Sequence, residues 1–173
     1  MWTYDKKLQY HVKIKNPNPQ LAQIIISQLG GPDGELGASM RYLNQRYVMP
    51  YKEVTGILTD VGTEELAHLE MVAAVLYQLT RNLKEEEIEG TPFAAYFVDH
   101  TTGIYPVAAA GVPFDMKYIG VKGDIIADLN EDLAADAAII KEQPLEKKSR
   151  KPLKYKAFSH LGKTPKNCIP AII

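Results

Sequence analysis

The chain has 173 residues, which suits a single domain, since one domain averages about 150 residues. Apolar residues make up 46% and charged residues 24%, a composition that excludes a wholly disordered protein. The formal net charge of −1 predicts no general attraction to nucleic acid or to a membrane surface. The single cysteine, Cys168, excludes a disulfide framework and a cysteine-rich metal site. Without a long apolar segment, we expect cytoplasmic synthesis and no membrane span.

The charge is divided unevenly along the chain. Residues 1–140 carry 11 basic and 19 acidic side chains, whereas residues 141–173 carry nine basic and two acidic ones. The second segment also contains several prolines, each of which costs about 3 kcal/mol inside a helix, so no long helix is expected there. We therefore predict a domain over 1–140 and a basic, proline-containing tail over 141–173. The tail is interpreted as a surface arm, with a specific binding segment as the alternative.

The first part of the chain predicts an extended arm and two helical segments. Residues 8–15 alternate between apolar and polar side chains, which indicates a short strand or an extended arm. Asn18 is placed to cap a helix that begins at Pro19 and continues to about residue 29. The sequence from Gly30 to Gly34 interrupts the helix, and helical character returns over residues 35–47.

The rest of the domain contains the strongest helical signal. Apolar residues recur at three- and four-residue steps over residues 51–82, as in a long amphipathic helix. Residues 84–87 are highly charged and predict a solvated connection or a short helix. Residues 91–123 show no sustained period and are expected to form a long loop with short elements. A last helix is predicted over about 124–143, with acidic residues early in it.

One polar pair interrupts the apolar face of the long helix. At about 100° per residue, Glu65 and His68 share a face, and Leu58 and Val72 lie within about 40° of Glu65. Glu64 is expected at the edge of this face or in solvent. An ionised carboxylate among apolar side chains is costly unless it is neutralised, and a metal ion is one way to do so.

The pair has two interpretations. Glu-x-x-His on an inward helix face is half of the ligand set of di-iron and di-manganese carboxylate proteins. Carboxylate and imidazole together suit manganese or iron better than a thiol-rich zinc site. The alternative is a local polar pair satisfied by a lysine, a backbone group or water.

Other carboxylates supply candidate partners. Glu35 shares a face with Tyr42, seven residues later, and is either the second kind of ligand that such a site needs or a carboxylate of a helix's first turn. In the last predicted helix, Asp128, Asp132 and Asp136 recur at four-residue intervals. Each of these three aspartates points either to the bundle centre or to solvent, and both interpretations stay open.

A series of motifs resembles the manganese catalase family. In order, the motifs are Asn16-Pro17-Asn18-Pro19, Gly30-Gly31-Pro32-Asp33-Gly34-Glu35-Leu36, Met40-Arg41-Tyr42, Gly62-Thr63-Glu64-Glu65-Leu66-Ala67-His68-Leu69-Glu70, Tyr96-Phe97-Val98-Asp99-His100, Ala109-Ala110-Gly111-Val112-Pro113-Phe114 and Ala127-Asp128-Leu129-Asn130-Glu131-Asp132-Leu133-Ala134-Ala135. The resemblance covers about residues 1–140 and is greatest to the short spore-coat branch, the CotJC type. It implies an all-α, ferritin-like helical bundle with an extended N-terminal arm.

The resemblance also implies a function. Two manganese ions would serve as cofactors, with iron as the alternative, and hydrogen peroxide would be converted to water and dioxygen. Homo-oligomers, spore-coat partner proteins and assembly into the spore coat are implied as well. Two alternatives stay open: a structural coat protein with an incomplete metal site, and a ferritin-like di-iron protein.

Site residues follow from the resemblance by position. Glu35 would be a terminal ligand, Glu65 the bridging carboxylate and His68 the imidazole ligand of the first ion. Tyr42 would lie just outside the ligands, and it and Glu65 are the implied catalytic residues. Asp136 stands where the family has a glutamate ligand for the second ion. The family's last histidine ligand, on a fourth helix, has no match, so that helix is expected to be missing or divergent.

Overall fold

The computed structural model describes residues 7–89 and 112–142, with side chains as far as residue 135. Within these ranges the chain is helical and contains no β-strand. The helices are α1 (Pro19–Ile25), α2 (Ser27–Gly30), α3 (Glu35–Gln45), α4 (Lys52–Thr80), α5 (Glu85–Ile88), the 3-10 helix η2 (Met116–Tyr118) and α6 (Ile125–Glu142). None of the helices in the described ranges is long and apolar enough to cross a bilayer.

The helix boundaries follow the local signals. The Asn18 side chain accepts a hydrogen bond from the Leu21 backbone N–H at 3.0 Å, and Pro19 occupies the first turn of α1, as predicted. The helix predicted over 19–29 is divided at Ile26 into α1 and α2. In the turn before α3, a Cβ added to Gly34 would lie 2.6 Å from the Ser27 carbonyl oxygen. Glycine is therefore required for this tight reversal.

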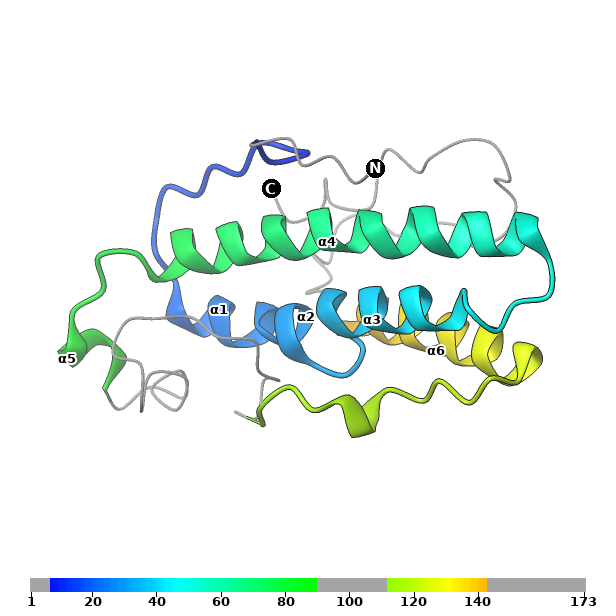
Figure 1. The fold of residues 1–173 in the computed structure, drawn as a ribbon. Coiled ribbons are helices and arrows are strands. Elements are labelled where there is room, and N and C mark those ends of the chain that lie inside the picture. The colour runs from blue at the N-terminus through cyan, green and yellow to red at the C-terminus, as the bar shows by residue number, and fades with distance from the viewer. Residues whose placement is uncertain (1–6, 90–111, 143–173) are drawn as a thin grey trace.

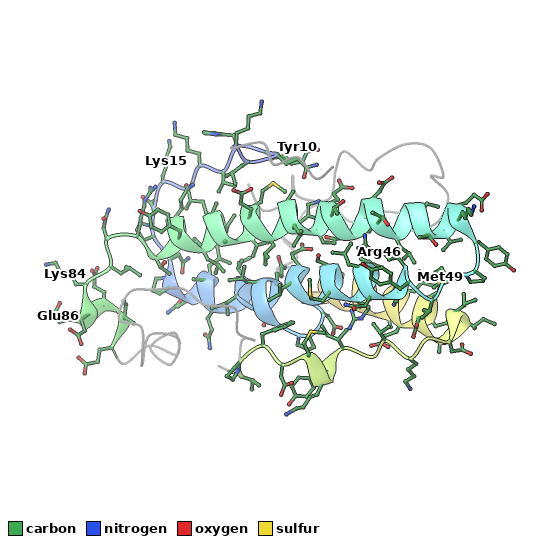
Figure 2. All side chains as sticks on the ribbon, in the orientation of Figure 1. Tyr10, Lys15, Arg46, Met49, Lys84 and Glu86 are labelled. Atoms are coloured by element: carbon green, nitrogen blue, oxygen red, sulfur yellow. The ribbon has the colours of Figure 1, made fainter. Side chains whose placement is uncertain are left out.

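Helices α1 to α3 follow one another in a row that runs antiparallel to α4, and α6 lies along α3 (Figure 1). Residues 8–15 form an extended arm along α4 and not a strand, because their backbone groups bond to side chains of that helix. The Ile14 N–H donates to Gln78 Oε1 at 2.7 Å, and Gln78 Nε2 donates to the Val12 carbonyl at 2.9 Å. In Figure 2 the arm, marked by Tyr10 and Lys15, lies on the side of α4 away from α3.

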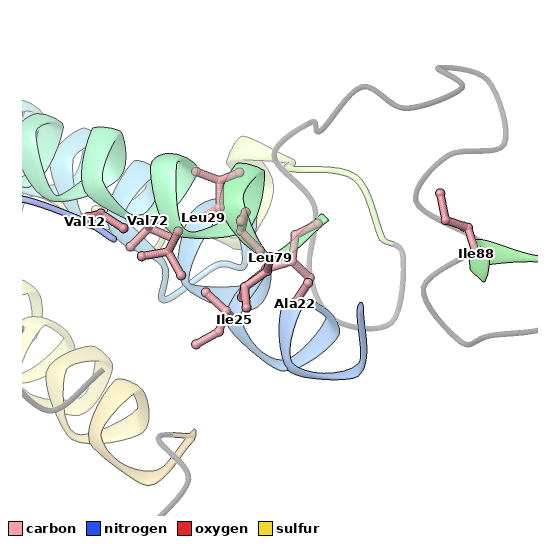
Figure 3. Packing of buried hydrophobic residues seen from close by; sticks show 10 residues of the cluster. Val12, Ala22, Ile25, Leu29, Val72, Leu79 and Ile88 are labelled. Carbon is pink, nitrogen blue, oxygen red and sulfur yellow. The ribbon is translucent and has the colours of Figure 1, made fainter. Parts of the chain in front are cut away.

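Two apolar clusters hold the helices together. The larger joins the arm, α1, α2, α5 and the C-terminal half of α4 (Figure 3). The smaller joins α3 to the N-terminal half of α4. The buried members of the larger cluster are Val12, Ala22, Ile25, Ile26, Leu29, Val72, Val75, Leu76, Leu79 and Ile88, and those of the smaller are Ala38, Tyr42, Met49 and Leu58. On α4, residues 62–68 separate the two clusters, because Val61 packs against the smaller cluster and Leu69 against the larger.

The structure describes only part of the chain after α4. The charged stretch contains the short helix α5, and the last helix, predicted over 124–143, is α6. Only the end of the predicted 91–123 loop is described, and it contains η2. Residues 143–173, with His160 and Cys168, lie outside the described residues, so the domain boundary at 140 stays a prediction.

Candidate metal centre

The first turn of α3 and the middle of α4 bring three potential ligands together. Glu65 and His68 lie one turn apart on α4, and His68 Nδ1 is 2.7 Å from Glu65 Oε2. Glu35, on α3, places Oε2 3.8 Å from the same ring nitrogen. One ligand atom from each residue lies within 4.8 Å of the others. The helix periodicity explains the first pair, whereas the approach of Glu35 depends on how α3 packs against α4.

All three side chains are largely buried. Their exposed fractions are 14% for Glu35, 15% for Glu65 and 17% for His68. The group lies between the two apolar clusters, since Leu58 and Val72 on the same face of α4 belong to different clusters. Glu65 therefore does not point into bulk solvent, which is what its place on the apolar stripe predicts.

The electrostatics of the group couple the acids to the imidazole. Burial alone raises the pKa of Glu65, but hydrogen bonds with His68 and Glu35 and the charge of His68 lower it by more, so its pKa lies below the usual value. Burial lowers the pKa of His68, but the hydrogen bond and charge of Glu65 and the charge of Glu64 raise it above the usual value. Glu65 and Glu64 thus favour the charged form of the imidazole, and His68 in turn favours the charged form of Glu65.

Glu64 lies at the edge of the site. Its side chain is 28% exposed, and its Oε1 is 3.9 Å from His68 Nε2, the ring nitrogen that faces away from Glu65. Gln9 of the arm donates to the same Glu64 oxygen at 3.4 Å. The sequence predicted an edge position but no partner. The sequence signal for this contact is the four-residue spacing from Glu64 to His68, which places both side chains on one side of the helix.

Two predicted site residues are not brought to this group by any described contact. Tyr42 is 7% exposed and packs with Ala38, Met49 and Leu58. Asp136 lies within α6, but its side chain is outside the described residues. The roles predicted for both residues are therefore still predictions.

The other two aspartates of α6 are not solvated, which corrects one of the two interpretations given to them. Asp128 is 0% and Asp132 4% exposed. The Asp128 carboxylate accepts the backbone N–H groups of Lys122 at 2.8 Å and Gly123 at 3.0 Å. Gln45 of α3 donates to Asp132 Oδ1 at 2.8 Å. Both carboxylates thus serve the packing of α6 against α3 and against the segment before it.

The donor set fits manganese or iron. Two carboxylates and one imidazole converge from two helices, and no thiol takes part. A hydrogen bond with Glu35 is one of the contacts that lower the pKa of Glu65, so a cation bound here would be neutralised by two neighbouring carboxylates. Of the residues that the structure describes, no other group of three acidic, histidine or cysteine side chains is spaced to hold an ion.

The fold is that of a ferritin-like helical protein, and the group of Glu35, Glu65 and His68 has the composition of a carboxylate and histidine metal centre. The sequence matches the family described as manganese containing catalase over residues 1–145, and the chain belongs to that family. The predicted all-α, ferritin-like fold is confirmed by this match and by the similarity to a solved manganese catalase described below.

Individual relatives agree with the family match. Protein CotJC of Bacillus subtilis is 53% identical over 136 residues, which cover 79% of this chain and 71% of CotJC. A probable manganese catalase of Clostridium acetobutylicum is 35% identical over 140 residues, and the chain spans 61% of its length. The crystal structure of KatB, a manganese catalase from Anabaena, superposes with a TM-score of 0.72 at 30% identity, covering 84% of this chain and 68% of KatB.

Proposed function

We propose that this protein is a manganese catalase that disproportionates hydrogen peroxide to water and dioxygen. One observation carries the proposal: Glu35, Glu65 and His68 converge within 4.8 Å in a chain of the manganese catalase family. Bound manganese would supply the redox chemistry. The protein would fix the ligands and keep the site largely enclosed, since the three side chains are at most 17% exposed.

We propose a role for each ligand. Glu65, whose Oε2 is 2.7 Å from His68 Nδ1, would be the bridging carboxylate, and Glu35 a terminal ligand. His68 would bind through Nδ1, the nitrogen that faces Glu65 and Glu35. Asp136 is proposed as a carboxylate for a second ion, and Tyr42 as the residue just outside the ligands.

We further propose that the protein is made in the cytoplasm, forms homo-oligomers and is assembled into the spore coat with other coat proteins. The similarity to CotJC supports this location. The tail over 141–173 is proposed as a segment separate from the ferritin-like domain. Its nine basic and two acidic side chains contrast with the acidic excess of residues 1–140.

Metal content and oxygen release test the function. The full chain is purified after expression with manganese, its bound metals are counted, and dioxygen is measured after hydrogen peroxide is added. Glu65→Gln should lose both bound metal and oxygen release, because it removes the carboxylate charge that lies beside Glu35 and His68. Glu53→Gln is the matched control, since Glu53 lies on the same helix but is exposed.

The outcomes separate the candidate functions. About two manganese ions per chain with oxygen release supports the catalase. A folded wild-type protein with less than one metal per chain contradicts it and favours a structural coat protein, for which the shorter Asp136 side chain is the supporting feature. Bound iron with little peroxide turnover favours a di-iron protein.

A further inference from the structure

Helices α3 and α4 make a close polar contact beside the metal centre. The Ser39 hydroxyl donates a hydrogen bond to the Gly62 backbone carbonyl, with 2.7 Å between the two oxygens. Ser39 is 0% exposed, and Gly62 is buried as well. This carbonyl lies inside a continuous helix, so the hydroxyl adds a bond between helices to the ladder within α4.

Gly62 allows this approach because it has no side chain. A Cβ added there would lie 2.8 Å from Leu43 Cγ, 2.9 Å from Leu43 Cδ2 and 3.1 Å from Tyr42 Cβ. Any larger residue would push α3 away from α4 or displace the side chains of α3. Gly56, on the same helix, has nothing within 4 Å of such a Cβ and is exposed.

The contact lies one helical turn from the ligands on both helices. Ser39 follows Glu35 by four residues, and Gly62 precedes Glu65 by three. One turn of helix spans about 5.4 Å. A shift of α3 along α4 by one turn would therefore carry Glu35 away from the ring nitrogen of His68, from which it is now 3.8 Å.

We propose that Ser39 and Gly62 are positioning residues of the metal centre. The apolar clusters on either side favour contact between α3 and α4, but apolar contact is not directional. The clusters alone therefore define the axial register of the two helices less strictly. A buried hydrogen bond at a site of close approach defines both the distance and the register. The inference rests on the proposed function, since it assumes that Glu35 and Glu65 bind the same metal centre.

The test compares three variants of the full chain: Ser39→Ala, Gly62→Ala and Gly56→Ala. Manganese affinity is measured by titration of the metal-free protein. Thermal unfolding is measured with and without manganese. We expect Ser39→Ala to weaken manganese binding by about tenfold, as for other residues that orient ligands, and Gly62→Ala to weaken it further. Gly56→Ala should bind manganese like the wild type.

A purely structural role makes a different prediction. It would lower the unfolding temperature equally with and without manganese, whereas a positioning role reduces the rise in temperature that manganese produces. If Gly62→Ala does not fold, Ser39→Ala still decides, because alanine fits the space of serine. If Ser39→Ala binds manganese with the affinity of the wild type, the inference is overturned and the proposed function is not. A wild-type protein that binds no manganese would overturn the proposed function, and the inference with it.

Discussion

Helix α3 buries carboxylates at two interfaces, and it does so in two different ways. At the α3–α6 interface, Asp132 accepts a hydrogen bond from the Gln45 amide of α3, and Asp128 accepts the backbone N–H groups of Lys122 and Gly123 just before α6. At the α3–α4 interface, Glu65 faces another carboxyl group and an imidazole. The first interface supplies neutral donors from the protein, whereas the second brings together groups that are themselves ligands.

The difference shows that burial of an acid is not by itself a sign of a metal site. A carboxylate that accepts peptide N–H groups has its oxygens satisfied by the protein itself. A carboxyl group that faces a second one needs a shared proton, an imidazolium or a metal ion. The chemistry of the partner groups, rather than the depth of burial, distinguishes Glu65 from Asp128.

The largest expected effect is at the α3–α4 interface. Glu65→Ala should abolish manganese binding, because only Glu35 and His68 of the three convergent ligands would remain, one on each helix. Metal analysis of the purified variant measures this. Manganese content equal to that of the wild type would reject Glu65 as a ligand.

The same type of change at the other interface should affect stability instead. Asp128→Asn removes the charge that accepts the Lys122 and Gly123 N–H groups and should cost about 2 kcal/mol of unfolding free energy. The manganese site formed by Glu35, Glu65 and His68 should still bind. Urea unfolding and manganese titration together test this. Loss of binding without loss of stability would remove the distinction between the two interfaces.

A smaller effect is expected at the rim of the metal centre. Glu64→Gln should weaken manganese binding by about tenfold, because the Glu64 carboxylate is placed to orient the second ring nitrogen of His68. Glu53→Gln, an exposed change on the same helix, serves as the control. Equal affinities for the two variants would show that His68 needs no such partner.

The smallest effect is on pH dependence. The raised pKa of His68 means that the folded metal-free protein favours the imidazolium, a stabilisation that is present at low pH and lost as pH rises through this pKa. Manganese must displace that proton, so its affinity should fall a few-fold between about pH 8 and about pH 7. Manganese titrations at several pH values measure the slope. A flat profile would show that no proton is released.

Local sequence signals predicted much of the fold. The Asn18 cap and the long amphipathic helix appear where the sequence placed them, and the predicted interruption lies between Gly30 and Glu35. Each depends on residues within one or two turns of each other. The same locality explains why Glu65 and His68 were identified as a pair, because a three-residue spacing fixes their shared face in any helix.

Contacts between helices required the tertiary structure. The position of Glu35 beside His68, the Ser39–Gly62 contact and the Gln45–Asp132 hydrogen bond each join residues that the sequence spacing does not relate. The physical reason is that helix periodicity defines which face a residue occupies but not how far a neighbouring helix slides along it. That choice is made by side-chain packing and by the few directional bonds that the packing permits.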